Sequence, residues 1–335
     1  MHYIVSGGSG FIGSALVKRL VEDGHIVTVL DNNSRGDPSR LDSLMDKIKF
    51  FECDIRNTDE VINLTKGAYS FIHLAAVNGT ENFYIDPEKV LDIGVRGMLS
   101  AIDACRHNNI KELIFASSSE AYQTPPVVPT PEDIPLVVPN VMNPRYSYGG
   151  SKIISELLAI NYGRKDFDRV MIFRPHNVYG PDMGWEHVLP QFILRAIRKI
   201  KQHPIGKVPF DILGDGKQTR AFIHIDDFID GIMIMLDKGE HLGIYNIGNM
   251  EEITIKDVAC KVVEYFGHEA EILIGDLAPG ETVRRCPDIE KINNLGFSPK
   301  INFDQGLPSI ANWYEKNSDS CNSESNPLMI DRLTK

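Results

Sequence analysis

Short apolar runs alternate with longer amphipathic stretches over the first 120 residues of the chain. The runs are bounded by turn residues and predict strands at residues 2–6, 26–30, 48–51, 71–74 and 113–116. Between the first two runs, Ile12, Leu16 and Leu20 recur at helical spacing, and Gly24 provides a stop signal. Strands that alternate with helices in this way predict βαβ units. We therefore expect an α/β fold with a doubly wound parallel sheet of the Rossmann type.

The pattern changes after residue 120. Seven prolines between residues 125 and 144 exclude a persistent helix or central strand, and predict a loop over the mouth of the active site. Residues 147–162 predict a helix and residues 170–173 a sixth strand. Beyond Pro175 the alternation becomes irregular. We expect a Rossmann domain at 1–175 to which part of 220–248 returns, a smaller α/β domain at 176–315, and a polar tail at 316–335.

Composition narrows the classes of partner. The 335 residues are 42% hydrophobic and 24% charged, as in ordinary globular proteins, and their net charge of -11 argues against a nucleic-acid partner. No apolar run approaches the roughly 18 residues of a membrane helix, and the N-terminus lacks a signal-peptide pattern. We expect no membrane segment and a cytoplasmic location. The five cysteines lack metal-ligand spacing, which predicts reduced structural thiols and no metal site.

A glycine motif follows the first strand and opens a helix, with glycines at Gly7, Gly10 and Gly13. Glycine lets a pyrophosphate approach the backbone, and the helix start, with Phe11 and Ile12, offers amide donors. A tight strand-to-helix turn also favours glycine, so the motif alone is weak evidence for a dinucleotide site. The residues around it strengthen that interpretation. Asp31, followed by Asn32, ends the second strand, where a carboxylate accepts hydrogen bonds from ribose hydroxyls. This favours NAD, although nearby Arg35 leaves NADP open.

Later strand ends extend the expected dinucleotide site. Asp54 and Ile55 follow the third strand and are expected to meet the adenine. The fourth strand ends in Leu74, Ala75 and Ala76, whose size suits a dinucleotide lying close to the backbone. Packing at a strand end is the alternative interpretation for each of these residues.

Tyr148 and Lys152 lie four residues apart on the predicted helix, so their side chains share a face. A phenol has a pKa near 10, and a neighbouring ammonium and an oxidised nicotinamide both favour phenolate, which can act as a general base. Alone, such a pair is usually a surface feature. Here it follows a complete dinucleotide motif and a strand that ends in Ser117, Ser118, Ser119 and Glu120.

Taken together, these motifs resemble the extended short-chain dehydrogenase/reductase family, in its nucleotide-sugar epimerase/dehydratase/decarboxylase branch. The resemblance covers residues 1 to about 310, through GGSGFIG, DNNSRG, CDI, HLAA, SSSEAY, YGGSK, RPHNVYGP, DGKQTRAFIHIDD and RRCPDI. It implies an enzyme with NAD and a UDP-, GDP-, CDP- or dTDP-sugar substrate bound to the second domain. It also implies a homodimer through a four-helix bundle that includes the Tyr148 helix, whose Ile153, Ile154, Leu157 and Leu158 exceed the needs of one core face.

The resemblance also implies residue roles. Tyr148 takes the proton of a sugar hydroxyl while hydride passes to NAD, Lys152 holds the nicotinamide ribose, and Ser118 bridges to the hydroxyl. Ser117 and Val178 are further cofactor contacts. The substrate contacts are Thr80, Asn177, His187, Val188, Gln191, Arg220 and one of Arg284 or Arg285. Two arginines suit a diphosphate, although each alone also fits a solvated surface charge.

In one place the chain departs from the family pattern. Gly94 stands where an asparagine is common, which leaves a role in the cofactor pocket to be filled by water or another side chain.

Oxidation at C4 makes the C5 proton acidic, and epimerisation, dehydration or decarboxylation can follow. Glu120 is the expected C5 base, because the dehydratases and decarboxylases of the family carry Glu at this place and simple 4-epimerases usually lack it; a solvated or capping Glu is the alternative. Ser119 stands where many dehydratases carry an acid, and an epimerase/dehydratase remains the leading expectation. Arg285 matches the decarboxylase arginine and keeps a UDP-glucuronate-type decarboxylase open. A non-catalytic NAD-binding regulator and a carbonyl reductase that releases its cofactor are the remaining alternatives.

Overall fold

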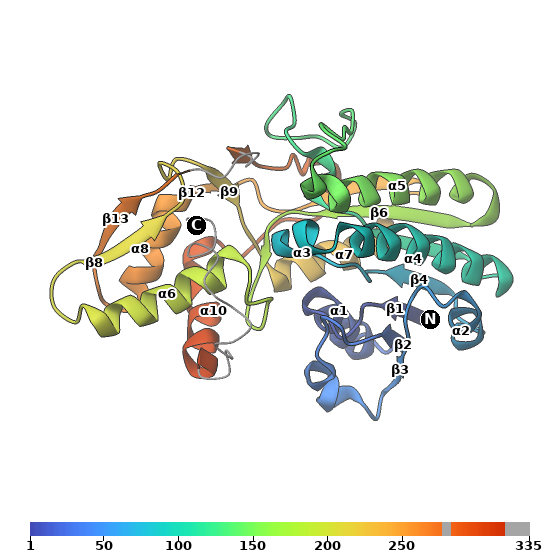
Figure 1. Cartoon of the computed structure of the whole chain (residues 1–335). Coiled ribbons are helices and arrows are strands. Elements are labelled where there is room, and N and C mark those ends of the chain that lie inside the picture. Colours follow the sequence, from blue (N-terminus) through green and yellow to red (C-terminus); the bar gives the residue numbers. More distant parts are fainter. Residues whose placement is uncertain (277–282, 319–335) are drawn as a thin grey trace.

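The computed structural model describes residues 1–276 and 283–318, and its centre is a seven-stranded sheet in which all neighbouring strands are parallel (Figure 1). The spatial order is β11-β6-β5-β4-β1-β2-β3. The strands are β1 (His2–Ser6), β2 (Ile26–Asp31), β3 (Ile48–Glu52), β4 (Ser70–His73), β5 (Glu112–Ala116), β6 (Arg169–Pro175) and β11 (Gly243–Ile247). The expected doubly wound parallel sheet is confirmed. All six expected strands are present.

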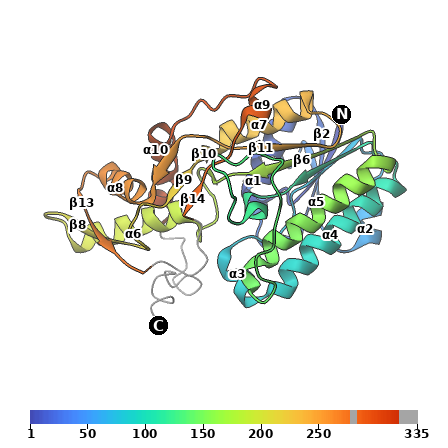
Figure 2. The ribbon, with the colours of Figure 1, turned by 90° about the horizontal axis from the view of Figure 1, so that it is seen from above.

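Helices cover both faces of this sheet (Figure 2). One face carries α2 (Thr58–Leu64), α4 (Pro87–His107) and α5 (Ser147–Asp166), and the other carries α1 (Phe11–Glu22) and α7 (Ile225–Lys238). Successive strand residues point to opposite faces, so Ile4 packs with the α4 and α5 core and Val5 with the α1 and α7 core. Burial on both faces explains why the inner strands are apolar runs, whereas the edge strand β3 is only partly buried.

A second lobe follows β6 and lies at the other end of the molecule (Figure 1). Its helices α6 (Val188–Gln202), α8 (Ile255–Tyr265) and α10 (Phe303–Asn317) share one core with the parallel pair β8 (Val208–Ile212) and β13 (Ala270–Ile274). Smaller elements lie between the lobe and the sheet: β7 (Val178–Tyr179), β9 (Thr219–Ala221), β10 (Ile223–His224), β12 (Glu252–Thr254) and β14 (Arg284–Arg285). Two short helices pack on the sheet-bearing part, α3 (Thr80–Ile85) against α4 and α9 (Glu290–Asn293) against β11.

The proline-rich segment forms an extended loop between residues 123 and 143. The loop is pinned to the segment after β14, because Thr130 donates its backbone N–H to Cys286 (2.9 Å) and accepts from Asp288 (2.9 Å). It therefore supports the strand that carries Arg284 and Arg285. None of the described helices is long and apolar enough to cross a membrane. The expected tail begins inside α10, and residues 319–335, including Cys321, lie outside the described residues.

Candidate active site

A cleft of about 460 Å³ lies at the carboxyl ends of the parallel strands and is lined from both lobes. Ligands bind at this edge in doubly wound sheets, because the loops and helix starts converge there. Most residues expected from the sequence line it: Gly7, Gly10, Phe11, Ile12, Gly13, Asp31, Asn32, Asp54, Ile55, Leu74, Ala75, Ala76, Ser117, Ser118, Ser119, Glu120, Tyr148, Lys152, Asn177, Val178, His187 and Arg285.

The glycines form the floor of the cleft under the start of α1. Gly7 has a φ of +75°, and a Cβ there would lie 2.8 Å from the backbone nitrogen of Ala75. A Cβ on Gly13 would lie 2.1 Å from the carbonyl oxygen of Gly7. Glycine therefore lets the turn between β1 and α1 pack tightly against its own backbone and the end of β4, and the amino end of α1 offers a ligand amide donors and a partial positive charge.

Asp31 ends β2 and is 8% exposed. One carboxylate oxygen accepts from the backbone N–H of Ser9 (3.0 Å), and the other accepts from that of Asn33 (2.9 Å). These bonds fix the carboxylate and leave each oxygen able to accept again. Arg35 does not neutralise it but forms an ion pair with Glu186 of the second lobe. A fixed anion at this point suits ribose hydroxyls and opposes a 2′-phosphate.

Lys152 lies one helical turn after Tyr148 on α5 and is buried. Its Nζ donates to the carbonyl oxygen of Ala116 at the end of β5 (2.7 Å) and lies 5.5 Å from the centre of the Tyr148 ring. Burial lowers the pKa of Lys152 to about 7, although the charge of Glu156 raises it. Near neutral pH the amine therefore exchanges a proton easily.

The Tyr148 ring stacks on Phe83 of α3, with centroids 5.1 Å apart and an interplanar angle of 11°. Burial raises the pKa of Tyr148 to about 12, and the opposing hydrogen bond with Ser118 and charge of Arg35 do not reverse this. In the protein alone the phenol is protonated at neutral pH. Its ionisation requires a further positive charge beside it.

Glu120 lies in a short 3-10 helix (Ser119–Tyr122) directly after β5, where its backbone N–H donates to the Ser118 hydroxyl (3.1 Å). Its carboxylate accepts from Nη1 of Arg285 (2.7 Å). Burial favours a raised pKa for Glu120, but the charges of Arg285, Arg145 and Arg220 outweigh burial, so the pKa is lowered. Glu120 is thus an ionised carboxylate held among arginines.

The two candidate arginines of β14 point in different directions. Arg285 reaches Glu120 in the cleft, whereas Arg284 is half-exposed and pairs with Glu252 (2.6 Å). Alternation along a strand separates neighbouring side chains in this way. Because β14 pairs in parallel with β9, Arg285 lies opposite Arg220, and the choice between the two β14 arginines falls on Arg285.

Of the other expected substrate contacts, Asn177 and His187 line the cleft. Asn177 adopts a φ of +42° and donates to the carbonyl of Ala221 (3.0 Å). Gln191 is buried in α6 and donates to the carbonyl of Trp185 (2.7 Å). Of the described residues, four expected contacts do not line the cleft: Val188, Gln191, Arg220 and Arg284. Thr80 begins α3, and its side chain lies outside the described part of the structure.

The model of the NAD dependent epimerase/dehydratase family matches residues 3–248. The chain belongs to this family. A putative UDP-glucose 4-epimerase of Methanocaldococcus jannaschii is 32% identical over 94% of this chain and 99% of its own length. UDP-glucuronic acid decarboxylase 2 of Arabidopsis thaliana is 32% identical over 92% of this chain and 67% of its own length.

A solved structure adds the cofactor to this comparison. The dTDP-glucose 4,6-dehydratase DesIV of Streptomyces venezuelae, solved with NAD bound, has a TM-score of 0.85 at 26% identity, covering 96% of this chain and 98% of its own. As an NAD-dependent epimerase/dehydratase, the protein takes NAD as its cofactor. The cleft fits this group, because Gly7, Gly10 and Gly13 line it at the amino end of α1 and Asp31 is fixed where ribose hydroxyls need an acceptor.

In this family member, the glycine that replaces a common asparagine has a packing role. A Cβ on Gly94 would lie 2.7 Å from the Cβ and Oγ of Ser151, and Ser155 donates to the Gly94 carbonyl (3.1 Å). Gly94 therefore lets α4 and α5 approach closely, and no side chain fits there. The neighbouring Ile93 lines the cleft instead.

Several polar residues of the epimerase/dehydratase site could not be found from local sequence patterns. Arg40 pairs with Asp182 across the two lobes (2.7 Å), beside the pair of Arg35 with Glu186. Behind the cleft, Glu156 of α5 accepts from the Ser117 hydroxyl (2.5 Å). The position of Glu156, one helical turn after Lys152, is the one sequence signal for these residues. It indicates that the two side chains share a helix face, but the partners of Glu156 become known only from the tertiary structure.

Proposed function

We propose that this NAD-dependent epimerase/dehydratase acts on a nucleotide-sugar and oxidises the C4 hydroxyl of the sugar to a 4-ketone. The observation that supports this most directly is the convergence of Ser118, Tyr148 and Lys152 at one end of the cofactor cleft, next to the ion pair of Glu120 with Arg285. Bound NAD supplies the hydride acceptor and a positive charge close to the phenol.

In this proposal, Tyr148 accepts the proton of the C4 hydroxyl and Ser118 orients that hydroxyl. The phenol starts with its pKa raised to about 12 by burial, so it becomes a base only when positive charge is added beside it. Lys152 provides part of that charge when protonated and can bond the nicotinamide ribose. Its pKa of about 7 lets it accept and release a proton at neutral pH.

Glu120 is proposed as the base for the sugar C5 proton, which the 4-ketone makes acidic. The carboxylate must be ionised to accept a proton, and the surrounding arginines lower its pKa. Removal of the C5 proton by Glu120 leads to dehydration when the C6 substituent leaves as water. If hydride instead returns to the opposite face of C4, epimerisation follows without a C5 base.

A second candidate, decarboxylation of a UDP-glucuronate-type substrate, is supported by Arg285. Its guanidinium lies in the cleft beside Glu120, and in this proposal it pairs with the C6 carboxylate of the sugar. The 32% identity with the Arabidopsis decarboxylase supports the same interpretation.

For either reaction we propose the same division of the chain. Residues 1–175, together with part of 220–248, bind NAD. Residues 176–315 mainly bind the UDP-, GDP-, CDP- or dTDP-sugar, with His187 and Arg220 near the nucleoside diphosphate.

The test is incubation with a panel of UDP-, GDP-, CDP- and dTDP-sugars, followed by mass spectrometry. Loss of water indicates a dehydratase, loss of carbon dioxide a decarboxylase, and an unchanged mass with a new retention time an epimerase. Tyr148→Phe should abolish turnover and keep NAD bound, whereas Tyr162→Phe, near the end of the same helix, should not change turnover. No turnover of any sugar by the wild type would contradict the proposal.

We also propose a homodimer. The outer face of α4 and α5, which run side by side in Figure 2, exposes Leu91 (39%), Ile154 (42%) and Leu157 (59%). Packing this face against a second copy gives a four-helix bundle and removes these side chains from water. Sedimentation as a monomer at micromolar concentration would refute the proposed homodimer.

We place the enzyme in the cytoplasm. The free thiols of the described cysteines agree with the reducing conditions there.

A further inference from the structure

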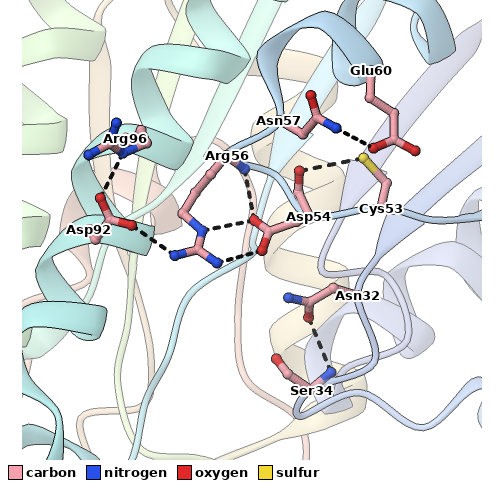
Figure 3. Close-up of polar contacts among 9 residues, drawn as sticks. All are labelled: Asn32, Ser34, Cys53, Asp54, Arg56, Asn57, Glu60, Asp92 and Arg96. Carbon is pink, nitrogen blue, oxygen red and sulfur yellow. Dashed lines mark hydrogen bonds and ion pairs between the residues drawn. The ribbon is translucent and has the colours of Figure 1, made fainter.

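Two clusters of polar side chains join segments that border the cleft, and they differ in burial. In the first, Arg56 donates from Nη2 to Asp54 after β3 (2.6 Å) and from Nη1 to Asp92 of α4 (2.8 Å), as Figure 3 shows. These three side chains are about a third exposed, so water competes for their bonds. The second cluster surrounds Asn246 of β11, which is 0% exposed. Buried polar groups depend on their protein partners, so this cluster constrains the segments that it joins.

Asn246 uses all four hydrogen-bonding positions of its side chain. Its Oδ1 accepts from the Tyr122 hydroxyl (2.7 Å) and from Nε2 of His176 (3.0 Å). Its Nδ2 donates to the carbonyl oxygens of Thr130 (2.9 Å) and Asp288 (3.0 Å). Because carbonyl oxygens only accept, the orientation of the amide is fixed, and any rotation of it would break bonds on both sides.

These bonds join the two chain segments that carry Glu120 and Arg285. Tyr122 ends the 3-10 helix that contains Glu120, and Asp288 lies shortly after Arg285. The Glu120 carboxylate and Nη1 of Arg285 meet in the cleft at 2.7 Å, although 165 residues separate them in the chain. The side chain of Asn246 therefore connects the supports of both partners of this ion pair.

Regular structure gives Arg285 little support beyond its pairing with β9. It ends β14, a strand of two residues, and the fully described chain between β14 and α9 forms no helix or strand. That stretch is held by Thr130, whose backbone bonds Cys286 and Asp288, and by Asn246, which bonds Thr130 and Asp288. Asn246 thus secures the segment that places the guanidinium of Arg285.

We propose that Asn246 is a positioning residue for the proton transfer at the sugar C5: its amide holds the turn of Glu120 and the segment of Arg285 at the separation at which the two side chains pair. This rests on the proposed role of Glu120 as the C5 base. Burial alone would raise the pKa of Glu120, and the charge of Arg285, together with those of Arg145 and Arg220, lowers it, so the carboxylate is ionised. A displaced Arg285 should raise that pKa in part, because the other two arginines still face Glu120.

Two variants loosen the connection from opposite ends. Asn246→Asp keeps the size of the side chain and its acceptor oxygen, but replaces the donor nitrogen, so at least one of the bonds to the two carbonyl oxygens is lost. Tyr122→Phe keeps both of those bonds and removes the link to the turn of Glu120. It also removes a hydroxyl that accepts from Nη1 of Arg174 (2.6 Å), which keeps its bond to the carbonyl of Glu132 (3.0 Å).

Tyr245→Phe is the matched control. Tyr245 neighbours Asn246 on β11 but points to the opposite face of the sheet, into the core with α1 and α7. Its hydroxyl accepts from the backbone N–H of Glu240 (2.9 Å). The control therefore also loses one hydroxyl bond but leaves the four bonds of Asn246 in place.

The experiment is a single turnover of a nucleotide-sugar that the wild type converts, followed by the absorbance of bound NADH and by product formation over a range of pH. In Asn246→Asp and Tyr122→Phe, hydride transfer from C4 should keep its rate, whereas the step at C5 should slow by about tenfold to a hundredfold, as for a displaced reacting group. Bound NADH should therefore accumulate, and the acid limb of the rate should move to higher pH. Tyr245→Phe should match the wild type in both respects.

The outcomes separate this inference from the proposed function. Wild-type kinetics in both variants, or an equal slowing of hydride transfer from C4, would overturn the role of Asn246 and leave the proposed function intact. A wild type that only epimerises would remove Glu120 from the reaction and overturn the inference, although oxidation at C4 would stand. No conversion of any sugar would instead contradict the proposed function. Circular dichroism shows whether each variant is folded, and Tyr122→Phe serves if Asn246→Asp is not.

Discussion

Replacing Glu156 with leucine should destabilise the protein strongly, because it leaves a buried guanidinium without its counter-ion. Arg174 donates to both carboxylate oxygens of Glu156 (2.8 and 2.6 Å), and the two side chains are only 2% and 6% exposed. Breaking a buried pair from one side costs about 3–5 kcal/mol. For 335 residues, an unfolding entropy of about 2.1 cal/mol/K per residue converts this into a Tm lower by roughly 4–7 °C.

The assay is thermal unfolding followed by circular dichroism, with Glu156→Leu compared against the double variant Glu156→Leu/Arg174→Met. The double variant removes both charges and fills similar volume, so it should recover part of the loss. The arginine also bonds Tyr122 (2.6 Å), which limits the recovery. A single variant that melts within about 1 °C of the wild type, or a double variant less stable than the single one, would show that the buried ion pair does not stabilise the fold in this way.

Three further predictions follow from the same geometry. Burial lowers the pKa of His176 to about 3. As the pH falls below about 6.5, the histidine is therefore protonated in the unfolded state but not in the folded state, and the protein loses stability. The urea midpoint should fall less steeply with decreasing pH in His176→Gln than in the wild type. Gly13→Ala should lose NAD binding in calorimetry, since its Cβ would lie 2.1 Å from the Gly7 oxygen, and unchanged affinity would contradict this. Arg40→Ala, which removes the pair with Asp182 across the lobes, should speed NAD release about fivefold in a displacement assay, and an unchanged rate would show that the pair does not retain cofactor.

The parallel sheet could be predicted because most of its first six strands are buried on both faces and leave apolar runs, and the partly buried edge strand β3 still carries Ile48, Phe50 and Phe51. The strands of the connecting region left no such signal. β14 consists of Arg284 and Arg285 alone and exists because β9 pairs with it. Periodicity cannot be read in two residues, so only the register shows which arginine enters the cleft.

Local motifs located the candidate catalytic residues but not their electrostatics. The spacing of Tyr148 and Lys152 indicates a shared face, and both line the cleft. Their pKa values, however, depend on burial, which raises that of the phenol and lowers that of the amine. Similarly, Glu120 is ionised because Arg285 reaches it from 165 residues away in the sequence. Such pairings arise only when distant segments fold together.

The central claim is that the sugar is oxidised at C4 with Tyr148 as the proton acceptor. The most direct measurement uses a nucleotide-sugar that the wild type converts, labelled with deuterium at C4, and follows the label by mass spectrometry and NMR. We expect deuterium to be retained in the product, and Tyr148→Phe to form no product while still binding NAD. Loss of the deuterium to water, or turnover of Tyr148→Phe at the wild-type rate, would contradict it.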